Sequence, residues 1–224
     1  MRRPRSASSS DESTSSTRRR IVTATIATLR EDGFAGTSAR AIARRGNFNQ
    51  ALIFYHFGSV VDVLVSALEQ VSARRLAQYR AALDGVNEPR KALSIARRQH
   101  AEDVRNGDVR VLVELIAGAP AVPELVPALT RCVEPWLSFT EEHIRRLLRG
   151  TPLAPLVPAR EAASAVIAIY LGAELLDHLD PTVQTAKPLF TLAARLQRAI
   201  DPTRVTSARP ARGARPRRVP IDGG

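Results

Sequence analysis

A short polar stretch near residue 50 carries side chains that could read the edges of nucleic-acid bases. Gln50 has an amide that both donates and accepts hydrogen bonds, so it can pair with the two Hoogsteen-edge groups of an adenine. Ala51 is small enough to contact a thymine methyl group or to allow close approach. Asn49 directly precedes them and is well suited to cap a short helix. These residue types, in this order, indicate a helix that enters the major groove of DNA.

Other polar residues close by could bind phosphate groups without distinguishing bases. Thr37, Ser38 and Arg40 lie at the expected start of the preceding helix, where backbone amides, a hydroxyl and a guanidinium can hold a phosphate. Tyr55 and His56 end the short helix and could contact the opposite phosphate strand, although His56 could instead be a half-buried core histidine. The stretch therefore contains base readers and residues that fix the position of the protein.

The elements that must hold these residues are two helices joined by a tight turn, the spacing of a helix-turn-helix. A first helix is expected over 17–32, with Gly33 as its stop. The second is expected over 37–46 and the third over 50–56. The turn Asn47-Phe48-Asn49 joins them, since Asn tolerates left-handed turns. The helix over 37–46 is thereby expected to brace across the DNA backbone, and the short third helix to read the bases.

A fourth helix is expected to begin at Ser59, with Asp62 three positions later in a capping-box arrangement. Its apolar stripe comprises Val60, Leu64, Leu68 and Val71. Phe48, Phe54 and Phe57 are expected to be core residues. Apolar residues then recur every three or four positions, which predicts further helices over 88–106, 109–118, 124–149, 159–179 and 185–200. The fold class is all-α, with about nine helices.

The composition divides this helical chain into parts. We expect a disordered Ser-rich arm over 1–16, a helix-turn-helix domain over 17–62, a larger domain over 63–200 and a disordered Arg-rich tail over 201–224. Residues 17–60 carry seven arginines against two acids, whereas residues 61–200 carry 17 basic against 16 acidic residues. A basic unit on a near-neutral body indicates that the first unit meets a polyanion.

The single cysteine, Cys132, precludes an internal disulfide and suits a reducing cytoplasm, where we expect the protein to be. Residues 162–176 are the most apolar stretch, but acidic residues bound or interrupt them. This pattern fits a buried or amphipathic helix better than a membrane span, so no membrane partner is expected.

The N-terminal unit resembles the DNA-binding domain of the TetR family of transcriptional regulators. The resemblance covers about residues 17–66 and rests on the run from Ile21 to Phe34, on Thr37, on Ile42-Ala43 and on the run from Leu52 to Ser59. It implies a three-helix DNA-binding domain followed by a larger helical domain that binds a small effector and dimerises. The implied function is a ligand-responsive repressor that binds a palindromic operator in double-stranded DNA as a homodimer.

Two positions depart from the family pattern. The family usually has Tyr where this chain has Phe54, so the hydroxyl that contacts phosphate is expected from Tyr55. It also usually has Lys where this chain has Val60. Either Val60 is exposed and one phosphate contact is missing, or Val60 belongs to the apolar stripe with Leu64.

The larger domain offers candidates for a dimer face and an effector pocket. The resemblance implies a four-helix dimer bundle formed by 159–179 and 185–200, which carry a small-residue strip (Ala165, Ala168 or Ile169, Gly172 and Leu176) and an apolar one (Leu189, Leu192, Ala193, Leu196 and Ile200). Both helices could instead be internal core. Sparse aromatic and polar residues of the middle helices are the natural lining for a pocket: His100, Trp136, Phe139, His143, Tyr170 and Glu174.

Two other classes of protein remain as alternatives. An enzyme would rest on Glu174 and His178, which lie one helical turn apart and could share a metal with Asp177 or His143. The chain has no second such pair, no phosphate-binding glycine loop and no nucleophile elbow, so neither a cofactor, a metal nor catalysis is expected. A nonspecific basic architectural protein would explain the charge but not the capped reading helix.

Overall fold

The computed structural model describes residues 7–180, 182 and 185–200, with side chains described from residue 12 to 195, and all regular structure in these residues is helical. The elements are α1 (Ala7–Gly36), α2 (Ala39–Gly46), α3 (Ala51–Phe57), α4 (Val60–Leu83), α5 (Pro89–Arg105), α6 (Asp108–Gly118), the 3-10 turn η1 (Pro123–Leu125), α7 (Val126–Leu148), α8 (Ala159–Leu179) and α9 (Ala186–Ile200). The predicted all-α class is confirmed.

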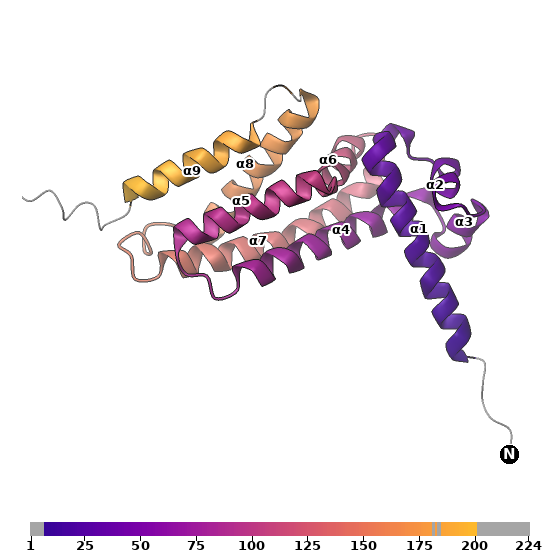
Figure 1. The fold of residues 1–224 in the computed structure, drawn as a ribbon, viewed down its shortest axis with the longest axis horizontal. Helices are drawn as coiled ribbons and strands as arrows, with labels where there is room; N and C mark the ends of the chain where they lie inside the picture. Colours follow the sequence, from indigo (N-terminus) through magenta and orange to yellow (C-terminus); the bar gives the residue numbers. More distant parts are fainter. Residues whose placement is uncertain (1–6, 181, 183–184, 201–224) are drawn as a thin grey trace, which may run out of the picture.

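The three N-terminal helices form one end of an elongated molecule (Figure 1). The long helices α4, α5 and α7 extend away from that end, with α4 packed against both α5 and α7. Helix α8 packs along α7 and against α6, and α9 packs against α5 and α8. The fold therefore carries the candidate reading helix α3 at one end and a larger helical body beyond it.

Local signals fix the helix boundaries near the predicted positions. Gly33 adopts φ 70° and ψ −176°, which breaks the helical path of α1 where the sequence predicts a stop. The hydroxyl of Ser59 accepts a hydrogen bond from the Asp62 amide at 3.1 Å, so the predicted cap of α4 is present. These caps work within a few residues, which is why the sequence alone places them well.

The first helix begins earlier than predicted. We expected its N-cap at Thr17, but α1 is already helical at Ala7, so residues 7–16 are not the expected disordered arm. The Thr17 hydroxyl donates to the Ser13 carbonyl at 3.0 Å inside the helix instead of capping it. Once the amphipathic part is formed, each added turn costs little, and Ser is only mildly unfavourable in helices. The expected tail over 201–224 and the first six residues lie outside the described part.

Two apolar clusters meet at the start of α4. The smaller one holds the N-terminal helices together and comprises Ile21, Ala24, Ile42, Ile53 and Val63. The larger one joins α1 to α4, α6 and α7, and the predicted stripe residues Leu64, Leu68 and Val71 belong to it. Phe48 and Phe57 pack against the smaller cluster as expected, but the prediction for Phe54 is wrong because 50% of that residue is exposed. Phe54 lies on the outer face of α3, away from the core.

Candidate nucleic-acid interface and buried polar cluster

The turn between α2 and α3 has the geometry of a helix-turn-helix. Ser38 caps α2 by accepting a hydrogen bond from the Ala41 amide at 3.2 Å. Asn47 ends α2 in the left-handed conformation, with φ 50° and ψ 57°, as its residue type allows. The Asn49 side chain then accepts from the Ala51 amide at 2.9 Å and starts α3. The predicted capping role of Asn49 is confirmed, with α3 beginning one residue later than expected.

The predicted DNA contacts lie at the surface of this end. Exposed residues are Ser38, Arg40, Asn49, Gln50, Ala51 and Tyr55, and the half-buried ones are Thr37 and His56. Tyr55 is 82% exposed, so its hydroxyl is accessible, whereas the Thr37 hydroxyl donates to the Gly33 carbonyl at 2.6 Å and steadies the preceding turn. The chain thus presents Gln50 and Ala51 at the start of α3, where a reading helix meets base edges.

Two arginines that we did not single out hold the turn and the end of the reading helix. The Arg20 guanidinium donates to the Gly46 carbonyl at 2.8 and 3.1 Å and to the Asn47 carbonyl at 2.5 Å, and it lies 5.7 Å from the Phe48 ring. Arg18 donates to the His56 carbonyl and lies 4.1 Å from the Phe57 ring. Both satisfy carbonyls that a helix end leaves without partners. No local signal could reveal them, because the partners are 26 or more positions away.

Some arginines of the N-terminal helices form ion pairs within the protein, so fewer of them are available to bind phosphates. Arg45 is paired with Glu31 and with Asp32, the latter at 2.9 Å. Arg30 is paired with the buried Asp108 of α6 at 2.5 Å. Arg40 and Arg44 are exposed, one turn apart on α2, and among the described residues no acid pairs with either. Arg44 is therefore a further candidate for phosphate binding on the same face as Arg40.

The position of Val60 decides between the two alternatives for the missing lysine. Val60 is half-buried and packs against both apolar clusters, at the junction of α3 and α4. It therefore belongs to the apolar stripe. The family's lysine is replaced by a residue that contributes to packing between the N-terminal helices and the body.

The six candidate effector residues lie in the larger domain, in two groups of three that contact one another within each group. His100 Nδ1 lies 3.4 Å from Glu174 Oε1, and the His100 ring stacks edge-on against Tyr170 with centroids 5.8 Å apart. Trp136 contacts Phe139, whose ring lies 4.2 Å from that of His143. The structure thus brings the six together as two groups of three, which come from α5, α7 and α8.

Arg75 of α4 joins these two groups, and sequence reasoning missed it. Its Nε donates to Asp103 at 2.9 Å, another guanidinium nitrogen donates to the Tyr170 hydroxyl at 3.0 Å, and its guanidinium lies 5.4 Å from the Trp136 ring. Arg75 and Asp103 are both almost fully buried. Such a pair is stable only when both charges have partners, and an arginine inside the apolar stripe of a helix is the one signal in the sequence that could have indicated it.

Burial also changes the protonation of the group around Glu174. Burial, with a smaller contribution from Asp177, raises the pKa of Glu174 to about 7. Burial, together with the positive charge of Arg75, lowers the pKa of His100 below its ordinary value. In the described part of the chain neither His100 Nδ1 nor Glu174 Oε1 has a hydrogen-bond partner. Buried polar atoms without hydrogen-bond partners are uncommon in folded proteins, so this pair is a notable feature of the interior.

Glu174 and His178, the pair that could have shared a metal, face two different residues. Glu174 faces His100, whereas His178 Nε2 lies 3.7 Å from Glu114 Oε1. No group of three or more His, Cys, Asp or Glu residues in the described ranges could hold a metal ion. The geometry therefore offers no support for the metal-enzyme alternative.

Helix α6 connects the body to the N-terminal helices. Asp108, at the start of α6, pairs at 2.5 Å with Arg30 of α1 and with Arg74 of α4. The Glu114 carboxylate accepts a hydrogen bond from the Phe34 amide at 2.7 Å, directly after α1 bends at Gly33. The Phe34 ring lies so close to Gly118 that a Cβ there would be 2.6 Å from it. A movement of α6 would therefore move the end of α1.

These features define a class of protein: a helix-turn-helix domain mounted on a larger helical body through α1, α4 and α6. Residues 21–66 match the sequence model of bacterial regulatory proteins of the tetR family. Residues 21–66 are therefore a TetR-family DNA-binding domain, as the resemblance implied.

Solved structures share the fold of most of the chain. A transcriptional regulator from Rhodococcus sp. Rha1 is 19% identical over 82% of this chain and 97% of its own, with a TM-score of 0.65. A TetR-family member from Streptomyces coelicolor A3 is 23% identical over 80% and 97%, with a TM-score of 0.59. A TetR-family regulator from Agrobacterium tumefaciens is 17% identical over 80% and 97%, with a TM-score of 0.63. No curated protein matches the chain. The body beyond residue 66 therefore has the fold of these regulators.

Proposed function

We propose that this protein is a cytoplasmic, sequence-specific repressor of transcription that binds a palindromic operator as a homodimer and releases it when a small molecule binds. The observation that carries the proposal is the start of α3, where the side chains of Asn49, Gln50 and Ala51 are exposed. Asn49 caps this helix, and Arg20 holds the turn before it. Exposed amides on a rigid helix can distinguish bases, whereas arginines alone bind any sequence.

A second copy of the chain is the natural partner for the exposed apolar face of α8. This helix is long and apolar enough to cross a membrane by length and composition, yet it packs along α7 and α6 and carries the buried Glu174 on its inner side. Its outer side exposes Val166, Ile169, Leu176 and Leu179, and α9 adds Leu192. Small residues at Ala165, Ala168 and Gly172 lie exposed among them and would permit close helix approach. Leu196 and Ile200 lie outside the side chains described.

The ligand response is supported by the contacts of α5 and α6. The buried polar cluster of α4, α5 and α8 comprises Arg75, His100, Asp103, Tyr170 and Glu174. Helix α5 leads directly into α6, which contacts α1 through Asp108 and Glu114. A ligand with different affinity for two arrangements of these helices would change the population of DNA-binding dimers.

Operator binding is tested by selecting bound fragments from random DNA and then comparing two variants. Gln50→Ala should weaken the selected site by about 1–3 kcal/mol and relax one base pair per half-site. Arg40→Ala should weaken selected and random DNA alike, because it removes a phosphate contact. Arg80→Ala, an exposed arginine near the far end of α4, is the matched control and should change neither. Equal effects of Gln50→Ala on both kinds of DNA would contradict specific reading.

Dimerisation is tested by placing a charge on the apolar face. Ile169→Glu should produce a monomer in light scattering and weaken operator binding, since half-sites are then bound one at a time. Leu156→Glu, at another exposed apolar residue in the segment between α7 and α8, is the control and should remain dimeric. A dimeric Ile169→Glu variant would show that α8 is not the interface.

A further inference from the structure

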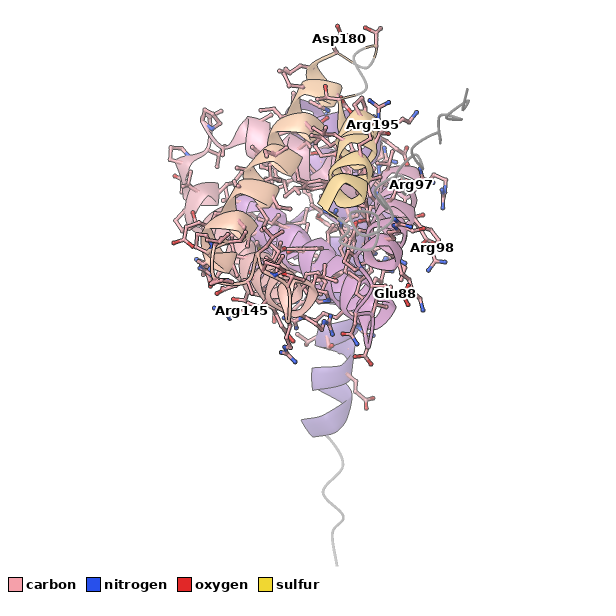
Figure 2. The ribbon with its side chains drawn as sticks, turned by 90° about the vertical axis from the view of Figure 1, so that its left-hand side faces the viewer. Glu88, Arg97, Arg98, Arg145, Asp180 and Arg195 are labelled. Carbon is pink, nitrogen blue, oxygen red and sulfur yellow. The ribbon has the colours of Figure 1, made fainter. Side chains whose placement is uncertain are left out.

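Beyond the DNA-binding end, exposed positive charge surrounds a groove between α5 and α9. The groove has a volume of about 760 Å³, and its rim carries Arg97, Arg98 and Arg105 from α5 and Lys187 from α9. Figure 2 shows Arg97 and Arg98 on the same side of the molecule as Arg195 of α9, away from Arg145. A groove of this size is typical of small-molecule sites.

None of the described residues that line the groove is acidic. Nor does any described acid form an ion pair with Arg97, Arg98 or Arg105, in contrast to Arg30, Arg45 and Arg75 elsewhere in the molecule. Arg98 and Arg105 are seven residues apart on α5, which places them two turns apart on one face of the helix. Three arginines without an acidic ion-pair partner among the described residues, in a concave site, favour an anion.

The floor and walls of the same groove are apolar and aromatic. Phe190 and His100 lie at its inner side, with ring centroids 5.2 Å apart, and Ile95 and Val104 contribute aliphatic surface. Val104 is half exposed and adds apolar surface to the groove. The groove therefore combines a cationic rim with an apolar floor.

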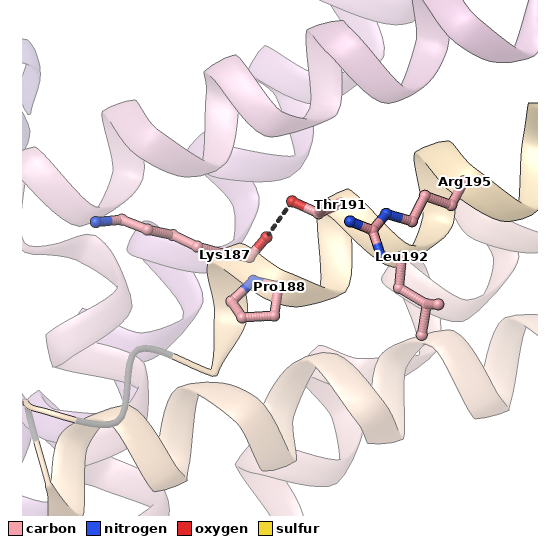
Figure 3. A pocket seen from close by; sticks show the side chains of 5 residues that line it. All are labelled: Lys187, Pro188, Thr191, Leu192 and Arg195. Carbon is pink, nitrogen blue, oxygen red and sulfur yellow. Dashed lines mark hydrogen bonds between the residues drawn. The ribbon is translucent and has the colours of Figure 1, made fainter.

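A second hollow, of about 510 Å³, lies on α9 and shares Lys187 and Thr191 with the groove (Figure 3). It is lined by α9 alone and includes Leu192, which belongs to the face proposed for the second copy. The groove between α5 and α9 has walls on both sides and is the better small-molecule site.

We propose that the groove between α5 and α9 binds an amphipathic organic anion, whose acidic head group pairs with the arginines of α5 and whose apolar body lies on Phe190 and His100. DNA phosphates of the operator are not the occupant, because the groove lies in the body, away from α3 (Figure 1). The inference rests on the proposed function in one respect: the anion is the effector, and its signal passes from α5 into α6 and to Arg30.

The site is tested with two fluorescent probes of the same aromatic framework, the anionic anilinonaphthalene sulfonate and the neutral phenylnaphthylamine. The full-length protein should bind the anionic probe about tenfold more tightly, and the preference should shrink as salt rises. The double variant Arg97→Ala/Arg98→Ala should lose most of this preference. The control Arg80→Ala/Arg149→Ala removes the same charge from exposed positions outside the groove and should retain it.

A third variant separates the floor from the rim. Phe190→Ala should weaken both probes by a similar factor, because it removes apolar contact without changing charge. Thermal melts of every variant show that the protein is folded at the temperature of the titration. Equal affinity for both probes, or a preference that survives in Arg97→Ala/Arg98→Ala, would overturn the proposal.

Operator binding in the presence of anilinonaphthalene sulfonate distinguishes the site from the proposed function. Charge-dependent probe binding that also weakens operator binding supports both. Charge-dependent binding without any effect on the operator supports the groove and contradicts the ligand response. Absence of charge-dependent binding in a protein that still selects an operator overturns the groove and leaves the DNA-binding function standing.

Discussion

The two ends of the molecule use polar side chains in opposite ways. Around α3, Arg40, Gln50 and Tyr55 face solvent, and the ion pairs of Arg45 lie at the surface. Between α4, α5 and α8, Arg75 and Asp103 are buried against one another. An exposed polar group without a protein partner costs little free energy, because water solvates it, whereas a buried polar group needs a partner within the fold. The first arrangement suits a surface that binds a polyanion, and the second suits an interior that can respond to a ligand.

The largest effect expected from this contrast is in Arg75→Ala. The substitution leaves the Asp103 carboxylate buried without its ion-pair partner and should lower the free energy of unfolding by about 3–5 kcal/mol. Urea denaturation measures the loss. Arg45→Ala, which breaks pairs with Glu31 and Asp32 at the surface, is the comparison and should cost less than about 1 kcal/mol. Similar losses in both variants would remove the distinction between the two ends.

Glu174 should make stability depend on pH. Its pKa in the fold, about 7, lies above its ordinary value of 4.5, so the native state holds a proton that the unfolded chain releases. The contribution of protonated Glu174 to stability is fully present below pH 4.5 and is lost as the pH rises to about 7. As the pH rises through that range, the free energy of unfolding of Glu174→Gln should therefore increase relative to that of the parent protein, by up to about 3 kcal/mol.

Denaturation curves at a series of pH values test the titration of Glu174. His100 contributes in the opposite direction, because burial lowers its pKa, but it is present in both proteins and cancels in the difference. Parallel pH profiles for the two proteins would show that Glu174 is ionised in the fold.

Val60→Lys tests how the two parts are joined. Since Val60 packs against both apolar clusters, a lysine there should lower the free energy of unfolding by about 1–2 kcal/mol and leave the salt dependence of DNA binding unchanged. Thermal melts and a salt series with operator and random DNA measure the two effects. An unchanged melting temperature with a salt slope steeper by about one unit would mean that position 60 faces phosphate as in the family.

The smallest effect is expected at the turn before α3. Arg20→Lys keeps the positive charge but removes the fork that donates to the Gly46 and Asn47 carbonyls. Operator affinity should fall about threefold, which corresponds to roughly 0.6 kcal/mol, while the salt dependence stays the same. Arg19→Lys, the neighbouring exposed arginine without such contacts to the turn, is the matched control. Identical affinity in both variants would show that the turn keeps its conformation without the Arg20 contacts.

Most helices could be predicted because their signals are local. Ser38, Asn49, Ser59 and Gly33 act on backbone groups within four positions, and the spacing of apolar residues repeats with the helical turn. The predictions for the start of α1 and for the burial of Phe54 were wrong because neither is set by a local signal. Helix propagation through a polar stretch and the outward rotation of one aromatic ring depend on neighbouring segments, which no local pattern describes.

The sequence by itself determined the all-α class, the helix-turn-helix and the polar residues at its surface. Only the tertiary structure decided which charges find partners inside the fold: Arg20 with the end of α2, Arg30 with Asp108, and Arg75 with Asp103 and Tyr170. Arg30 and Asp108 are separated by 78 positions, and Arg75 and Tyr170 by 95. The physical reason is that burial and pairing depend on distances between segments far apart in the chain, whereas helix formation depends on hydrogen bonds four residues long.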